Sequence, residues 1–374
     1  MRLVDLRHMT ISDDGMTVLA PGLASLRLLK KLDLSSNNIG DEGLGALAAA
    51  QRDFRYLEKL FLGSSKTFSG TGQLLHLGSN ATFSAVGLKA LSRVLQTVSS
   101  LKTLDLRTNS IDDEGLHAFM MWVDERFTIH SLILTNNAIS TVGPFTASKR
   151  SPLCRLDLQD NTIGDNDGAM EALAEGMKRL RNLEYLKLNR VSSSALSVLA
   201  TVFRSEKCSL QTLDLFEPEI EDSGAIALAN GLKGNQSLTK VCFDRKSLSD
   251  VGWSAFEKLL CDTSSVNNTY CSNHTLEEIG YIHYGLPPSI KALLELNKQE
   301  DQGVNVPIRK ILMSHSEFDM TPLLQWKLKL LPFVVTWFDY VRSRSGQPIR
   351  SRTEFQKRKL SAVFQYRRSF SLSS

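Results

Sequence analysis

A glycine turn between a predicted strand and a predicted helix is the first feature of the chain that could carry chemistry. In LDLSSNNIGDEGLGAL, residues 32–47, Gly40 and Gly43 stand where the strand ends and the helix begins. Many phosphate-binding loops are built in this way, because free amides at a helix N-terminus attract anions. Asp41 lies at the same helix start, and its carboxylate competes with an anion for those amides. The stretch therefore does not favour a phosphate site.

Paired carboxylates and histidines are the other side chains that could catalyse a reaction. The pairs Asp13 with Asp14 and Asp112 with Asp113 lie at predicted helix starts, where capping of free amides accounts for them. The seven histidines are scattered, with neither metal-ligand spacing nor a neighbouring nucleophile. The motifs G-x-x-x-x-G-K-S/T, H-E-x-x-H and G-x-S-x-G are absent from the sequence. We predict that the protein is not an enzyme, binds no metal or cofactor, and has no small-molecule substrate.

The same strand, turn and helix pattern returns along the chain, so the opening stretch is one copy of a repeat. The third apolar anchor of the pattern recurs at Leu32, Leu60, Leu104, Leu132, Leu156, Leu186, Leu213 and Val241. The spacings between these anchors are 28, 44, 28, 24, 30, 27 and 28 residues. The spacing of 44 predicts an insertion within residues 66–80, and the spacing of 24 predicts that the fourth copy has lost most of its helix. A truncated copy at 4–16 and a degenerate copy at 266–276 extend the series.

Each consensus position has a physical reason. The two leucines of L-x-L lie on one face of a strand, because strand side chains alternate. An asparagine follows the strand in several copies, where its amide can bond to backbone groups that have lost their ladder partners. Aspartates such as Asp41 are expected to cap the helix, and glycines such as Gly43 to permit tight packing against the strand. Later copies lack the asparagine and predict less regular turns, with its place taken by Val191, Pro218 and Lys246.

The pattern L-x-x-L-x-L-x-x-N-x-I-x-D-x-G-x-x-x-L, repeated about nine times between residues 3 and 276, resembles the leucine-rich repeat family. It is similar to the ribonuclease-inhibitor type with 28-residue repeats, which Ran GTPase-activating proteins and NOD-like receptors share. The resemblance implies an α/β solenoid, a horseshoe with parallel inner strands and outer helices. It also implies a protein-protein interaction scaffold that binds a partner protein, of unknown identity, on its concave surface.

A single repeat cannot bury its apolar face alone, so an array depends on stacked neighbours and needs a cap at its end. We predict a solenoid over residues 1–276, a helical C-terminal cap over 277–345, and a basic, partly flexible tail over 346–374. The cap is expected to bury Trp326, Leu330, Phe333 and Trp337. From Lys327 to Ser374 eleven Lys and Arg stand against two acidic residues, a local charge of +9, which leaves −5 (4 − 9) for the rest of the chain.

The candidate partner-binding residues lie between and just after the leucines of the strands. They are Asp33, Phe61, Asp105, Arg107, Ile133, Asp157, Lys187, Arg190, Asp214 and Phe216. The four aspartates predict an acidic stripe that steers a basic partner, although aspartate is common at this position of the repeat class. Exposed aromatic and apolar side chains on a rigid sheet are the more usual anchors of an interface, which favours Phe61, Ile133 and Phe216.

Two alternative functions stay open. A Ran-type GTPase-activating protein would direct Arg7 or Arg107, in loops after strands, toward a nucleotide-bound partner. That group typically ends in a strongly acidic segment, whereas this chain ends in a basic one, so we rank this function second. The basic region 342–368 predicts, as the other alternative, an adaptor that contacts nucleic acid or an anionic membrane.

Composition and cysteines bear on the compartment. A chain with 42% apolar and 22% charged residues is typical of a globular protein. The five cysteines are an odd number without C-x-x-C spacing, so we expect reduced cysteines and neither a disulfide framework nor a zinc site. The stretch MRLVDLRHMTISDD is charged and predicts no secretory signal, and no segment approaches the roughly 18 apolar residues of a membrane span. We predict a cytoplasmic protein, while the cluster QKRKL at 356–360 leaves a nuclear location open.

Overall fold

The computed structural model describes most of the repeats and part of the chain that follows them. The described residues are 2–50, 54, 56–63, 85–98, 100–123, 128–141, 151–163, 167–205, 207–216, 220–244, 248–280, 285–298 and 305–315. The chain forms two compact units. The first, here called the repeat unit, comprises Met1–Phe256 and Thr275–Gly285. The second, here called the C-terminal unit, comprises Glu257–His274 and Leu286–Ser374.

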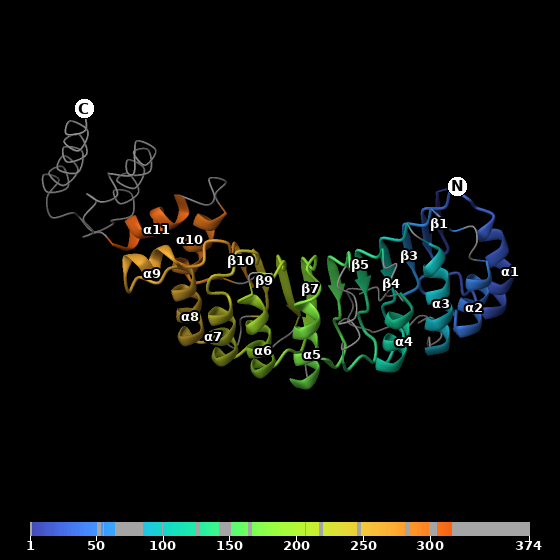
Figure 1. The fold of residues 1–374 in the computed structure, drawn as a ribbon, viewed down its shortest axis with the longest axis horizontal. Helices are drawn as coiled ribbons and strands as arrows, with labels where there is room; N and C mark the ends of the chain where they lie inside the picture. The colour runs from blue at the N-terminus through green and yellow to red at the C-terminus, as the bar shows by residue number, and fades with distance from the viewer. Residues whose placement is uncertain are drawn as a thin grey trace, which may run out of the picture. The chain divides into compact units, whose positions relative to one another are not determined.

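Short parallel strands, paired in chain order, form the sheet of the repeat unit (Figure 1). They are β1 (Leu3–Asp5), β2 (Lys31–Asp33), β3 (Lys59–Phe61), β4 (Thr103–Asp105), β5 (Ser131–Ile133), β6 (Arg155–Asp157), β7 (Tyr185–Asn189), β8 (Thr212–Phe216), β9 (Lys240–Cys242) and β10 (Glu278–Ile279). Parallel neighbours need a crossover between them, and most of the crossovers here contain a helix. This arrangement confirms the predicted α/β solenoid of parallel strands and helices.

The helices of the crossovers lie along one side of the sheet (Figure 1). They are α1 (Asp13–Ala24), α2 (Asp41–Ala49), α3 (Ala85–Thr97), α4 (Asp113–Val123), α5 (Asp167–Met177), α6 (Ser193–Phe203), α7 (Asp222–Gly231) and α8 (Asp250–Leu260). Each helix from α1 to α4 packs against the next, and α5 to α7 do likewise. Between β5 and β6 the described residues contain no helix, and residues 142–150 lie outside them. The predicted insertion at 66–80 also lies outside the described residues.

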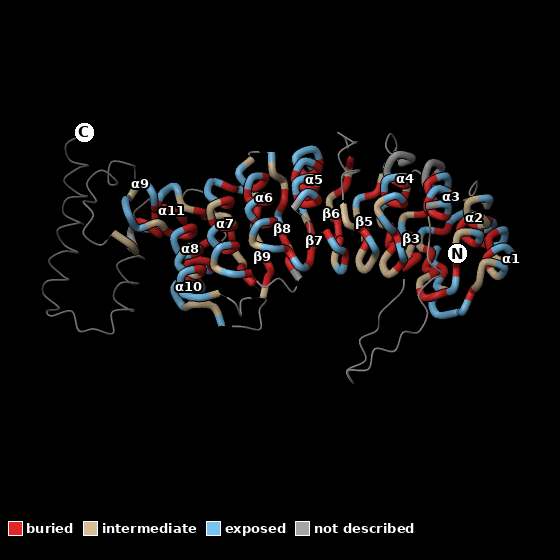
Figure 2. The backbone as a smooth tube through the Cα atoms, turned by 90° about the horizontal axis from the view of Figure 1, so that it is seen from below, coloured by how far each residue is buried: buried red, intermediate tan, exposed pale blue. Residues whose placement is uncertain are grey.

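The register of the sheet confirms the repeat anchors. Every anchor from Leu32 to Val241 stands opposite its neighbours across the strands and is fully buried. Val4 and Ile279 continue this row at its two ends. Figure 2 shows the buried residues following the strands from repeat to repeat. The copy predicted at 266–276 is wrong in position, because a helix starts at residue 266 and the last strand follows at residue 278.

Asparagine side chains join each repeat to the one before it. The Asn37 side-chain amide donates to the Leu6 carbonyl of the preceding repeat at 2.9 Å, and its Oδ1 accepts from the Ile11 amide at 3.1 Å. Asn137 and Asn161 make the same two kinds of bond with the repeats that precede them. The predicted role of these amides, to satisfy backbone groups at the turn, is therefore confirmed for these three copies.

The turn of the sixth copy is regular, which corrects the expectation drawn from Val191. Arg190 has a φ of +50°, close to the +56° of Ser36 and the +55° of Thr108 at the same place in other copies. Val191 is 2% exposed, so apolar packing takes the place of the missing amide. The later turns, which contain Pro218 and Lys246, lie outside the described residues.

Asp13 and Asp222, at two helix starts, cap the helix of the following repeat, whereas Asp112 caps its own helix α4 by accepting from the Gly115 amide at 2.8 Å. Asp13 Oδ1 accepts hydrogen bonds from the amides of Gly40 at 2.6 Å and Gly43 at 3.0 Å, at the start of α2. Asp222 Oδ1 bonds in the same way to the start of α8, with the Gly252 amide at 3.1 Å. A Cβ on Gly43 would lie 2.6 Å from Asp13 Oδ1. The glycine therefore permits close packing against the preceding repeat, which corrects the expected packing against the strand.

The C-terminal unit contains a fully buried lysine. The unit contains residues 257–260 at the end of α8, and its other described helices are α9 (Val266–Tyr270), α10 (Pro288–Asn297) and α11 (Asn305–Ser314). Lys310 Nζ, which has no exposed surface, donates to the Leu260 carbonyl at 2.8 Å and the Asn273 carbonyl at 3.0 Å. Burial lowers the pKa of Lys310 to about 7. The four aromatic and apolar residues predicted to be buried in the cap, and the basic tail, lie outside the described residues.

Candidate protein-binding face

The sheet face turned away from the helices, here called the open sheet face, presents three rows of side chains. Strand side chains alternate, so the residues between the buried leucines lie on this face. The first row contains Lys31, Lys59, Thr103, Ser131, Arg155, Tyr185, Thr212 and Lys240. The second contains Asp33, Phe61, Asp105, Ile133, Asp157, Lys187, Asp214 and Cys242. The third, just after most of the strands, contains Ser35, Gly63, Arg107, Thr135, Gln159, Asn189, Phe216 and Asp244.

None of the partner-binding residues predicted from the sequence belongs to the first row. The signal for it is present in the sequence, because Lys31, Asp33 and Ser35 alternate strictly with the leucines. A strand that begins two residues before Asp33 must place Lys31 on the same face. The first row matters because it contains four basic residues and a tyrosine.

Three of the four aspartates of the second row are buried, and the fourth, Asp214, is half-buried, so the row does not form an exposed stripe. Asp33, Asp105 and Asp157 are only 5%, 4% and 8% exposed. Each accepts a hydrogen bond from the backbone amide two residues further on, at 3.1 to 3.2 Å. Such a local bond is a structural reason for aspartate at this position. The expectation that these carboxylates are presented to a basic partner is therefore corrected.

Arginines neutralise two of the carboxylates on this face. Arg107 Nε donates to both carboxylate oxygens of Asp105, at 3.0 and 2.9 Å, and these bonds raise the pKa of Arg107. Hydrogen bonds from Arg7, whose Nη2 lies 2.8 Å from Asp5 Oδ2, lower the pKa of Asp5 to about 2. Both arginines that GTPase activation would use are thus held by carboxylates of their own repeats.

Aromatic rings hold basic side chains in place on the open sheet face. The Arg155 guanidinium carbon lies 3.7 Å from the centroid of the Tyr185 ring, and the Tyr185 hydroxyl donates to Asp214 Oδ2 at 2.9 Å. This chain of contacts links β6, β7 and β8. Burial raises the pKa of Tyr185, so the hydroxyl stays a neutral donor. Nearer the N-terminus, Lys31 Nζ lies 4.8 Å from the centroid of the Phe61 ring.

The other predicted site residues occupy separate places. Ile133 and Lys187 are half-buried in the second row, and Arg190 is exposed at the turn after β7. Phe216 ends β8, and its side chain lies outside the described residues. Cys242, near the end of the second row, is 4% exposed, and burial raises its pKa to about 11.

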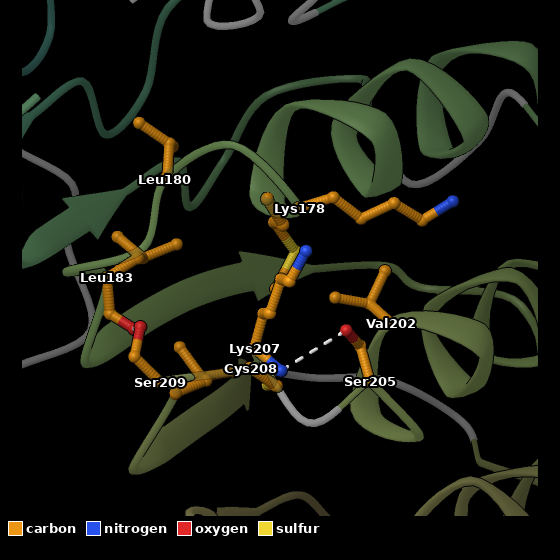
Figure 3. Close-up of a pocket in the computed structure, with 10 residues that line it drawn as sticks. Lys178, Leu180, Leu183, Val202, Ser205, Lys207, Cys208 and Ser209 are labelled. Carbon is orange, nitrogen blue, oxygen red and sulfur yellow. Dashed lines mark hydrogen bonds between the residues drawn. The ribbon is translucent and has the colours of Figure 1, made fainter. Parts of the chain in front are cut away.

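Figure 3 shows a small pocket near the C-terminal ends of α5 and α6. Leu180, Leu183 and Cys208 are among its lining residues, and it has room for about one water molecule. The Lys207 amide donates to Ser205 Oγ there at 3.3 Å. Within the described ranges, no group of three His, Cys, Asp or Glu is arranged to hold a metal ion. None of the helices in those ranges is long and apolar enough to cross a membrane.

Comparison with known proteins places the repeat in a family. A model described as Leucine Rich repeat matches residues 25–48, 99–120 and 206–229. Ribonuclease inhibitor from pig (Sus scrofa) is 30% identical over 152 residues, which are 38% of this chain and 33% of that protein. The human NACHT, LRR and PYD domains-containing protein 3 is 30% identical over 201 residues, 51% of this chain and 19% of that protein. The human NACHT, LRR and PYD domains-containing protein 5 is 25% identical over 242 residues, 56% of this chain and 20% of that protein.

The chain spans a third or less of the length of these relatives. A solved structure of a protein from Bacteroides fragilis covers 72% of this chain and 70% of its own, at 16% identity and a TM-score of 0.41. Proteins built from leucine-rich repeats are in general protein-interaction scaffolds. From the repeat consensus, the parallel register of its strands and the matched relatives, the chain is a leucine-rich repeat protein of the ribonuclease-inhibitor type.

Proposed function

We propose that this protein is a scaffold without catalytic activity that binds a partner protein on its open sheet face. The observation that carries the proposal is the chain of contacts from Arg155 through Tyr185 to Asp214. Arginine and tyrosine side chains held in place at a protein surface are typical energetic anchors of protein interfaces. Side chains fixed before binding lose little conformational entropy when a partner arrives. Phe61 and Ile133, both half-buried in the second row, add apolar contact area.

The pocket shown in Figure 3 does not suit a small-molecule ligand. Small-molecule sites are usually concave cavities of several hundred Å³. This pocket has space for about one water molecule, and it lies between the segments that connect α5 to β7 and α6 to β8. The relative from pig is by name an inhibitor of a ribonuclease, which is itself a protein. We extend to this chain only that general property, the binding of a protein.

No observation favours GTPase activation as a second function. Arg107 would have to leave Asp105, which it holds through both carboxylate oxygens, before it reached a nucleotide. Arg7 would likewise have to leave Asp5. The region 342–368, on which binding to nucleic acid or an anionic membrane depends, lies outside the described residues. That contact and the cytoplasmic or nuclear location remain predictions.

Affinity capture from cell extract with three versions of the protein tests the proposal. The face variant carries Phe61→Ala and Tyr185→Ala, and the control variant carries Val18→Ala and Val251→Ala, two helix positions that are 80% and 59% exposed. We expect a specific partner to be retained by the wild type and the control, and to bind the face variant about tenfold more weakly or less, as loss of hot-spot side chains does. Thermal unfolding of each version checks that it is folded. A partner that the face variant retains and the control loses would place binding on the helices instead.

A further inference from the structure

We propose that the open sheet face between β3 and β7 binds an acidic segment of the partner, with an apolar side chain of that segment placed on Ile133. The proposal rests on the proposed function and names the chemistry of the partner. Four basic residues, here called the basic patch, surround Ile133 on this part of the face. They are Lys59, Arg107, Arg155 and Lys187.

The basic patch outweighs the carboxylates in its charge. Across the three rows of β3 to β7 the only acidic residues are Asp105 and Asp157, so four cations face two anions, a net charge of +2 (4 − 2). Lys59 is exposed, and the other three basic side chains are half-buried. Among the described residues, no carboxylate lies within ion-pair distance of Lys59 or Arg155.

The two carboxylates are recessed and already bonded. Asp105 is 4% exposed and is held by Arg107. Asp157 is 8% exposed and accepts from the Thr135 hydroxyl at 2.9 Å and from the backbone amide of Gln159 at 3.2 Å. A partner approaching the sheet therefore meets cations before it meets carboxylates. The sign of the recognised charge is opposite to that expected from the row of aspartates alone.

Small side chains leave a shallow floor between the basic residues. In the first row, Thr103 and Ser131 lie between Lys59 and Arg155. Three strand spacings separate these two basic residues, about 14 Å, which is the length of about four residues of extended chain. Carboxylates about four residues apart in a partner segment that crosses the strands reach both. An apolar residue between those carboxylates then lies over Thr103 and Ser131, from which its side chain reaches Ile133, the next residue of β5 on the same face.

Arg155 is the residue best prepared to bind a carboxylate. Its guanidinium is stacked on Tyr185, whose hydroxyl is fixed by Asp214. Stacking uses the face of the guanidinium and leaves N–H groups at its edge, which match the two oxygens of a carboxylate. Because the stack fixes the side chain, less rotamer entropy is lost on binding.

Two synthetic fluorescein-labelled peptides test the sign of the charge. One has two glutamates four residues apart with leucine between them, and the other has lysines in place of the glutamates. Fluorescence anisotropy measures their binding to the wild type, to Lys59→Glu with Arg155→Glu, and to Lys233→Glu with Lys291→Glu. The last pair makes the same charge change at exposed positions outside the open sheet face. Far-ultraviolet circular dichroism and thermal unfolding confirm that each variant is folded.

We expect the glutamate peptide to bind the wild type and the control pair alike, and the Lys59→Glu, Arg155→Glu variant about tenfold more weakly or less. Added salt should weaken this binding, because exposed charges are screened. Equal or tighter binding of the lysine peptide by the wild type would overturn the proposal. So would unchanged binding of the glutamate peptide by the Lys59→Glu, Arg155→Glu variant.

Photo-crosslinking separates failure of this inference from failure of the proposed function. The crosslinker p-benzoylphenylalanine is incorporated in place of Ile133, and separately in place of Val18 on α1. An acidic partner segment attached at Ile133 supports both proposals. A basic or neutral segment attached there overturns the acidic segment and leaves binding on the face intact. Crosslinking of partners from Val18 alone overturns both.

Discussion

Gly43 and Gly45 lie two residues apart on α2 and differ in what surrounds them. A Cβ on Gly43 would lie 2.6 Å from Asp13 Oδ1 and 2.8 Å from Ile39 Cγ2, whereas one on Gly45 would meet nothing within 4 Å. We expect Gly43→Ala to lower the free energy of unfolding by about 1 to 3 kcal/mol through overpacking. Gly45→Ala should raise it by up to about 1 kcal/mol through helix propensity. Urea unfolding of both variants beside the wild type measures the two changes, and a shift of the same sign would contradict the packing role of Gly43.

The sequence predicted the positions of residues that recur in the repeat, but it did not predict which side chains they bond to. The buried leucines follow from the strand alternation, and the asparagine amides follow from the turn that the copies with asparagine share. The aspartates were placed in the correct row, but their burial depends on side chains that vary between copies. Asp105 is covered by Arg107, and Asp157 is bonded by Thr135, a residue of the neighbouring repeat. A repeat consensus carries no information on such copy-specific partners.

At the scale of elements, the start of one helix depends on a carboxylate of the helix before it. Asp13 bonds to the first amides of α2, while the start of α1 itself is capped by the Ser12 hydroxyl, which accepts from Gly15 at 3.3 Å. We expect Asp13→Ala to cost about 1 kcal/mol of unfolding free energy, as the loss of an N-cap does. Hydrogen exchange should become faster in the first turn of α2 and stay unchanged in the first turn of α1.

Asp14→Ala is the matched control for this prediction. Asp14 is the next residue of the same helix turn, is exposed, and accepts no hydrogen bond from the described residues. Its removal should change stability by a few tenths of a kcal/mol through the helix dipole alone. Faster exchange confined to α1 in Asp13→Ala would show that this carboxylate caps its own helix after all.

The repeat pattern predicted the positions of most strands correctly and that of the last strand wrongly. Strands β2 to β9 lie at their predicted anchors, because two apolar residues separated by one residue are buried together on an extended chain. The last copy was misplaced because residues 266–270 form a helix whose N-cap, Ser265, accepts from the Asn268 amide at 3.1 Å. The true strand signal is Leu276 and Ile279, which lie three residues apart, as Leu238 and Val241 do in the preceding copy, although Ile279 follows Val241 by 38 residues (279 − 241). The expected repeat period placed a strand where Ser265, an N-cap residue, in fact starts a helix.

At the scale of the whole molecule, the helices of the repeat unit form two groups in which each helix packs against the next. Helices α1 to α4 pack one against the next, as do α5 to α7, and the described residues contain no helix between β5 and β6. In a repeat array each copy contacts only its neighbours, so stability is a sum of copy and interface terms. The interface between β5 and β6 has the strand pairing of every other interface but lacks a described pair of packed helices. The 24-residue spacing from Leu132 to Leu156 predicts that this copy has lost most of its helix, so we expect the array to separate here into two blocks, β1 to β5 and β6 to α7.

Core truncations on either side of that interface test whether the blocks open separately. Leu60 in β3 and Leu186 in β7 are fully buried, and truncation of such a leucine to alanine costs about 2 to 5 kcal/mol. We expect Leu60→Ala to lower hydrogen-exchange protection from β1 to α4 and leave α5 to α7 protected, and Leu186→Ala to do the reverse. Each variant serves as the control for the other, because the truncation and the depth of burial are the same. Equal loss of protection in both blocks from either variant would show that strand pairing alone couples the array into one cooperative unit.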